Sequence, residues 1–186
     1  MAVSFSLEFK KQLKQLTDKE KDKLILRALR RDAELTDALR FELLPDVTLE
    51  SVQAETEDRL HEMFNLSVSG YQLHRSLTKA LGKAVKEVSR ARRVTKDKQL
   101  EVDLNMYLLR LILGNYSGAL NSSYSSFYKA TARLAVRTTG QILKNLHEDY
   151  WVEYKPELDE FLQQLGRYDN RWQLTYELPK ELEMPI

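Results

Sequence analysis

Glycine and proline are scarce in this chain, and their scarcity limits what the chain can fold into. The sequence has 186 residues, of which only 6 are glycine and 4 are proline. Since turns depend on these two residues, so few of them favour long regular elements joined by short connections. Helices fit that description better than a β fold with its many turns. The sequence therefore predicts an all-α protein.

Hydrophobic periodicity agrees with this prediction along almost the whole chain. Apolar residues recur at the three- and four-residue spacing of one helix face, which predicts about seven or eight helices. A capping box at Thr17-Asp-Lys-Glu20 indicates where the second helix begins. A later helix is expected to stop at Pro45. Three helices are expected between residues 17 and 64. The other expected helices cover 4–15, 70–94, 98–113, 126–147 and 156–164.

A chain of this length fits one domain with a substantial core. We expect residues 1–166 to form an all-helical domain, either an irregular bundle or a short stack of helical hairpins. The helix at 98–113 is apolar on most sides and should lie at the centre. Residues 167–186 are expected to form a C-terminal tail that docks on the domain, with Trp172, Leu174 and Tyr176 as its anchors.

Cysteine is absent, which excludes disulfides and thiol nucleophiles. The first residues lack the basic and then apolar pattern of a signal peptide. The most apolar run, 106–114, is interrupted by Arg110 and is far shorter than the roughly 20 residues of a membrane span. These features predict a cytoplasmic protein with no membrane span.

Charged residues are sorted into blocks, although the chain as a whole carries only +1. Residues 1–31 carry +5, residues 32–64 carry −8 and residues 65–98 carry +7. Residues 99–146 sum to +3 and residues 147–186 to −6. Such blocks create local fields that select partners by charge, but they do not indicate a reaction.

The most pronounced cationic feature lies on the expected helix 70–94. Six Lys and Arg residues, named here the basic ridge, recur at spacings of three and four residues. On a helix they fall within roughly 80° of arc along about 27 Å of the axis, almost opposite the apolar face. Arg92, Lys96 and Lys98 are expected to extend the ridge past the helix end. The basic ridge consists of Arg75, Lys79, Lys83, Lys86, Arg90 and Arg93.

Three environments suit such a ridge. It can pair with the acidic residues of 32–64 and be an ordinary solvated helix face. It can instead bind an acidic surface of another protein, or follow the phosphates of a nucleic acid without reading bases. No aromatic residues interleave with the ridge to stack bases, and the sequence pI of about 7.9 is low for a nucleic-acid-binding protein. Among external partners the sequence thus favours an acidic protein, with nucleic acid as the alternative.

Other short patterns carry less information. Glu57 and His61 are four residues apart on one expected helix, but a catalytic zinc needs a third protein ligand. Ser126 and Lys129 match the SxxK pattern of acyl-transfer enzymes without its companion motifs, so Ser126 is better explained as a helix N-cap. No glycine-rich phosphate loop occurs. We therefore predict no metal and no cofactor, and a non-enzymatic interaction module rather than an enzyme.

The order of features along the chain is also informative. A short first helix rich in Lys and Leu leads into Leu16-Thr-Asp-Lys-Glu-Lys-Asp-Lys-Leu24, and the break at Pro45 follows. After them come the basic amphipathic helix and an aromatic end at Tyr168-Asp-Asn-Arg-Trp172. This layout resembles an uncharacterised bacterial family of all-helical domains of unknown function. The resemblance implies an all-helical fold and assigns no activity and no functional residue.

Overall fold

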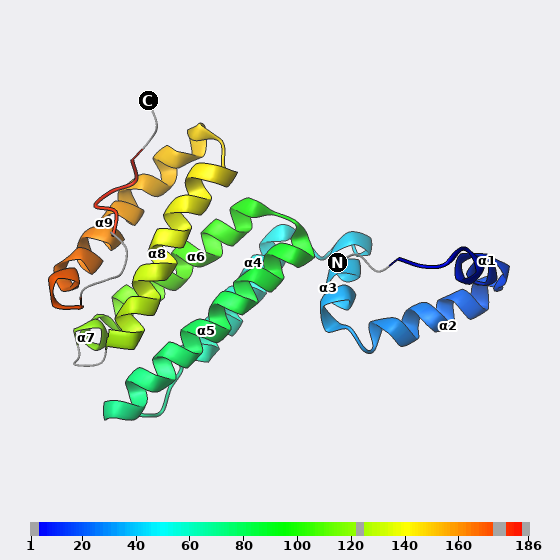
Figure 1. Ribbon diagram of the computed structural model, residues 1–186, viewed down its shortest axis with the longest axis horizontal. Coiled ribbons are helices and arrows are strands. Elements are labelled where there is room, and N and C mark those ends of the chain that lie inside the picture. The colour runs from blue at the N-terminus through cyan, green and yellow to red at the C-terminus, as the bar shows by residue number, and fades with distance from the viewer. Residues whose placement is uncertain (1–3, 122–124, 173–177, 184–186) are drawn as a thin grey trace. The chain divides into compact units, whose positions relative to one another are not determined.

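The computed structural model describes residues 4–121, 125–172 and 178–183. These residues form nine α-helices and no strand, which confirms the all-α prediction (Figure 1). The chain divides into two compact units, Met1–Pro45 and Asp46–Ile186, named here unit 1 and unit 2.

Unit 1 contains three helices, and the side chain before each of them caps its first turn. Ser6, Thr17 and Asp32 each accept a hydrogen bond from a backbone N–H of the helix that follows. The predicted capping box is present, since the backbone N–H of Thr17 also donates to Glu20 Oε2 at 2.9 Å. None of the described residues of unit 1 is buried. The helices are α1 (Leu7–Gln15), α2 (Asp18–Leu29) and α3 (Ala33–Leu43).

Unit 2 holds the hydrophobic core, and α6 lies at its centre. This helix contacts α4, α5, α8 and α9, and most of its residues are buried (Figure 1). The prediction that residues 98–113 are central is therefore confirmed. The helices of unit 2 are α4 (Leu49–Phe64), α5 (Gly70–Thr95), α6 (Lys98–Asn115), α7 (Ser117–Leu120), α8 (Ser125–Asn145) and α9 (Glu148–Trp172).

A very short connection joins α5 to α6. Lys96 ends α5 in the left-handed conformation with φ of 59°, and Asp97 caps α6 by accepting the backbone N–H of Leu100 at 2.7 Å. Two helices joined so closely must fold back on each other. This turn fixes which face of α5 meets α6 and therefore which face points away from the core.

Helix α9 differs from the prediction. A short helix at 156–164 was expected because Pro156 suits a first turn and Gly166 suits a helix end, but α9 contains both residues in its interior. A tertiary contact supports its early start, since Trp151 Nε1–H donates to the carbonyls of Ile142 at 3.1 Å and Leu146 at 3.2 Å. Ile142 lies in the last turn of α8 and Leu146 directly follows the helix, where carbonyls have few partners within the helix. The domain boundary expected after residue 166 accordingly falls inside α9.

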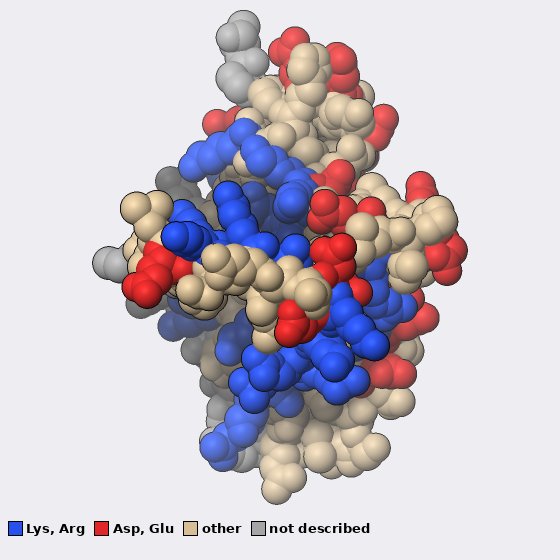
Figure 2. All heavy atoms as spheres, turned by 90° about the vertical axis from the view of Figure 1, so that its right-hand side faces the viewer, with Lys and Arg blue, Asp and Glu red and all other residues tan. Residues whose placement is uncertain are grey.

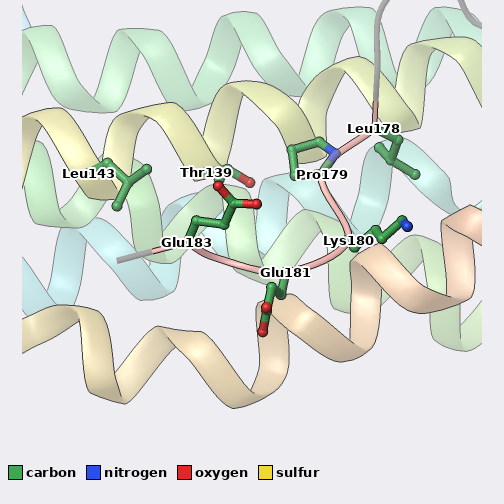
Figure 3. Close-up of a pocket in the computed structure, with 7 residues that line it drawn as sticks. All are labelled: Thr139, Leu143, Leu178, Pro179, Lys180, Glu181 and Glu183. Atoms are coloured by element: carbon green, nitrogen blue, oxygen red, sulfur yellow. The ribbon is translucent and has the colours of Figure 1, made fainter. Parts of the chain in front are cut away.

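Residues 178–183, named here the C-terminal strap, cross unit 2 beside α8 and α9 (Figure 3). Leu178 and Leu182 are buried in the core. Lys155 Nζ donates to the Leu182 carbonyl at 2.8 Å, and the Leu182 N–H donates to Asp159 Oδ1 at 2.6 Å. Leu174 and Tyr176, two of the expected anchors, lie outside the described residues, and so does the side chain of the third anchor, Trp172.

Candidate functional site

The basic ridge occupies the outer face of α5. On the inner face Leu77, Leu81, Ala84 and Val88 are at most 2% exposed. On the outer face Arg90 is half-buried, and the other five members of the ridge are exposed. The helical spacing in the sequence has thus placed apolar and cationic residues on opposite sides of one helix.

Helices α4 and α8 lie on the two flanks of α5. On one flank, Arg59 of α4 pairs with Glu87 of α5 through Nε and Oε1 at 3.0 Å. On the other flank, the hydroxyl oxygen of Thr78 on α5 lies 3.3 Å from the hydroxyl oxygen of Ser126 on α8. Arg90 Nη1 also contacts Glu87 Oε1, at 3.1 Å. Glu87 is the only acidic residue of α5, and its charge is therefore already matched by two arginines.

The carboxylates of α4 do not neutralise the outer face of α5. Within the described ranges Arg75, Lys79, Lys83 and Lys86 form no ion pair. Among the acidic residues of α4, Glu55 pairs with Arg59 of its own helix at 3.8 Å, and Glu57 accepts a hydrogen bond from Gln53. Four neighbouring cations are consequently left to solvent. Figure 2 colours Lys and Arg side chains blue and Asp and Glu side chains red on one side of the molecule, where several blue side chains adjoin one another.

Arg92 corrects one part of the sequence prediction. It was expected to extend the ridge, but its Nε lies 2.9 Å from Glu101 Oε2 on α6. Arg137 of α8 holds the other carboxylate oxygen, with Nη2 to Oε1 at 2.6 Å. Glu101 is 5% exposed, so the two arginines compensate a buried charge. Arg92, Glu101 and Arg137, named here the buried triad, join α5, α6 and α8.

A second polar pair joins α6 to α9. Tyr154 Oη donates to Asp103 Oδ1 at 2.5 Å. Burial raises the pKa of Asp103, although the hydrogen bond from Tyr154 opposes that rise. Burial and the bond to Asp103 likewise raise the pKa of Tyr154. Neither residue lines the hollows beside the C-terminal strap, so this pair serves the packing of α9 on α6.

The weaker sequence patterns do not form a reaction centre in the described residues. Glu57 Oε1 accepts from Gln53 Nε2 at 2.9 Å, and no group of three or more metal-binding side chains occurs in the described ranges. Ser126 lies inside the first turn of α8 and not before it, which corrects its expected role as N-cap. A hollow of about 510 Å³ lies beside the C-terminal strap (Figure 3). Its polar lining consists of Thr139, Lys180, Glu181 and Glu183, and the Thr139 hydroxyl donates to the Ala135 carbonyl of its own helix at 3.0 Å.

Sequence reasoning missed a second row of cations. Four exposed cations follow one another at spacings of four, four and three residues along α2 and its C-cap: Lys19, Lys23, Arg27 and the C-cap Arg30. The test that found the basic ridge would have found this row, since both have the same helical spacing.

No family model, no curated protein and no solved structure matches this chain. The resemblance to a bacterial helical family therefore stays a prediction. None of the described helices has the length and apolar character needed to cross a membrane.

Proposed function

We propose that this protein is a helical interaction module whose basic ridge binds an acidic surface of another protein. The observation that carries the proposal is the exposure of Arg75, Lys79, Lys83 and Lys86 without an ion pair in the described part of the chain. These four residues span about 16 Å of a rigid helix. Helix α5 is held by the core, so the row of charges is preorganised for a complementary surface.

The energetics favour a bound partner. Like charges at i and i+4 on a helix destabilise it by about 0.2–0.5 kcal/mol per pair. The chain accepts that cost at successive positions of α5, and an acidic partner would offset it. Opposite potentials on two proteins also accelerate their encounter, so the ridge should act mainly on the association rate.

An acidic protein fits the surroundings of the ridge better than a nucleic acid does. Helix α4 packs beside α5 and carries exposed carboxylates at Glu55, Asp58 and Glu62. A duplex has phosphates all along its surface, and these carboxylates would repel it. A folded partner can instead place acidic residues over the ridge alone. The proposed setting is the cytoplasm of a bacterial cell, and it rests on the lack of cysteine and on the family resemblance.

The test uses poly-L-glutamate and a DNA duplex as probes of the two chemistries. The variant Lys83→Glu/Lys86→Glu removes the centre of the ridge. Its control, Lys144→Glu/Lys180→Glu, changes the net charge equally at two exposed lysines outside the ridge. Each protein is titrated with a labelled probe at about 50 mM and about 200 mM salt, where phosphate binding weakens steeply.

We expect the ridge variant to lose at least about tenfold in affinity for poly-L-glutamate, mainly through slower association. Its unfolding free energy should stay within about 0.5 kcal/mol of wild type, because the changed residues are exposed. Equal losses in the ridge variant and its control would refute a specific site. Tighter binding of the duplex than of poly-L-glutamate, abolished in the ridge variant, would establish the nucleic-acid alternative instead.

A further inference from the structure

The C-terminal strap lies between α8 and α9 in a seat that is wider than the strap itself (Figure 3). On one side, a hollow of about 510 Å³ is bounded by Thr139 and Leu143 of α8. On the other side, a second hollow of about 510 Å³ is bounded by Leu162 and Gly166 of α9. The same strap residues, 178–181, line both hollows. Without the strap the two hollows would therefore join into one groove along α8 and α9.

The seat holds the backbone of one strap residue from both sides. Lys155 Nζ donates to the Leu182 carbonyl at 2.8 Å, and Asp159 Oδ1 accepts from the Leu182 N–H at 2.6 Å. Lys155 and Asp159 are one turn apart on α9 and contact each other at 3.0 Å, so the donor and the acceptor are fixed relative to each other. Such an arrangement recognises an extended peptide, because the N–H and C=O groups inside a helix already bind each other.

Two apolar side chains and one carboxylate of the strap make the contacts that depend on its sequence. Leu178 and Leu182 are 7% and 0% exposed. Glu181 Oε2 lies 3.2 Å from Lys155 Nζ. Lys180, in contrast, is exposed. The seat thus selects a segment with the pattern Leu-x-x-Glu-Leu.

Few contacts keep the strap in its seat. Among the described residues, its backbone bonds to α9 only through Leu182. Every residue of the strap loses conformational entropy when it is ordered, and only these bonds and the two buried leucines offset that loss. Segments with so few contacts open locally while the helices beneath them stay folded. We therefore expect the strap to leave its seat without unfolding of unit 2.

We propose that this seat is a peptide-binding groove, occupied by the chain's own strap, and that it takes a Leu-x-x-Glu-Leu segment of a partner protein. The strap shows the chemistry of the ligand, since it satisfies Lys155 and Asp159 and places a leucine at each apolar position. The partner segment replaces the strap, which makes the strap an intramolecular competitor. The groove belongs to α8 and α9 and does not depend on the basic ridge of α5.

Other occupants fit the groove less well. A small apolar molecule could fill the hollows but would leave Lys155 and Asp159 without the backbone groups that they bind here. The strap of a second copy would make the same contacts as the chain's own strap, which has the advantage of a high effective concentration. A partner segment can instead gain affinity by filling the two hollows, because the strap leaves them open.

The first experiment measures the binding of a fluorescent peptide with the sequence of residues 178–183 by anisotropy. The full chain carrying Leu178→Ser/Leu182→Ser, named here the strap variant, lacks the leucines that hold its own strap. We expect it to bind the peptide at least about tenfold more tightly than wild type, in which the strap competes. A peptide with Leu182→Ser should not bind the strap variant.

Lys155→Met, added to the strap variant, tests the contact with the peptide backbone. It removes the donor to the Leu182 carbonyl but keeps a side chain of similar length. We expect peptide binding to weaken at least about tenfold. Lys144→Met is the matched control, because Lys144 is exposed on α8 and lies outside the lining of both hollows. It should leave peptide binding unchanged.

A second peptide tests whether the hollows favour an external ligand. Lys180 borders both hollows and is exposed, so Lys180→Trp in the peptide adds apolar surface that can enter them. We expect this peptide to bind the strap variant at least about threefold more tightly than the first peptide. Equal binding would refute the claim that a partner segment gains affinity over the strap by filling the hollows.

Hydrogen exchange in wild type tests the opening of the strap without any substitution. The amide of Leu182 should exchange at least about 100-fold faster than the amide of Leu108, which is buried in α6. Excess peptide should accelerate exchange at Leu182 further, because the bound peptide keeps the strap out of its seat.

Four results would overturn the proposal. Equal exchange at Leu182 and Leu108 would mean that the strap opens only when unit 2 unfolds. The same conclusion follows if the strap variant has the circular dichroism of wild type but does not bind the peptide. If the strap variant does not fold, a peptide that leaves exchange at Leu182 of wild type unchanged decides against the groove. A wild-type dimer in sedimentation velocity that becomes a monomer with Lys155→Met would show that two copies exchange straps instead.

Discussion

Glu101→Gln tests whether the buried triad holds α5, α6 and α8 together. The substitution keeps the shape of the side chain but replaces the carboxylate with an amide. The amide has one acceptor oxygen, so it can accept from Arg92 or from Arg137 but places an NH₂ group against the other. The protein thus loses a negative charge that two arginines approach at 2.9 and 2.6 Å.

The magnitude follows from the burial of each partner. Hydrogen bonds to charged groups contribute about 1.5–3 kcal/mol, and breaking a fully buried ion pair costs about 3–5 kcal/mol. Glu101 is 5% exposed, but the side chains of Arg92 and Arg137 are 42% and 40% exposed. Water can therefore solvate both guanidinium groups after the substitution, which lowers the cost below that of a fully buried pair. We expect a loss of about 2 kcal/mol.

Glu157→Gln is the matched control, because it makes the same chemical change in a more exposed pair. Arg110 donates to both oxygens of Glu157 at 2.6 and 2.9 Å, but the two side chains are 59% and 35% exposed. Exposed pairs contribute about 0–1 kcal/mol, so this variant should lose less than about 1 kcal/mol. Urea unfolding monitored by circular dichroism gives both free energies, with unchanged m-values as the condition for comparing them. Equal losses in the two variants would refute the argument that burial decides the difference.

Two further predictions concern α6. Leu108→Ala should lower the unfolding free energy by about 2–5 kcal/mol because Leu108 is fully buried, whereas Leu43→Ala, at a residue 71% exposed, should change it by less than about 0.5 kcal/mol. A loss under about 1 kcal/mol for Leu108→Ala in urea unfolding would contradict the central position of α6. For Asp103, burial raises the pKa above its ordinary value of 3.8, so the folded protein binds that proton more tightly than the unfolded chain. The stability that the protonated Asp103 contributes is present at low pH and is lost as the pH rises through the folded pKa. The unfolding free energy of wild type should therefore fall relative to that of Asp103→Asn as the pH rises above 3.8. A difference between the two proteins that does not change with pH would contradict this assignment.

Local signals in the sequence were sufficient for most helix boundaries. The Thr17 capping box, the stop after Leu43 before Pro45 and the break at Lys96 and Asp97 all depend on residues close together in the chain. Such signals act through the backbone groups of one turn, so they survive in the folded protein. The α9 helix was the exception. Its start is supported by the bond of Trp151 to carbonyls of α8, a contact that depends on packing between helices.

The sequence by itself determined the class of fold and the candidate surface. Helical periodicity placed Leu77 and Lys83 on opposite faces of α5, because a helix turns by a fixed angle at each residue. It could not determine which cations remain exposed. Arg92 and Lys86 have the same charge on the same helix, yet Arg92 pairs with the buried Glu101 while Lys86 is left to solvent. Only the tertiary structure decides between them, because an ion pair forms when packing brings two side chains together, and that distance is not encoded in spacing along one helix.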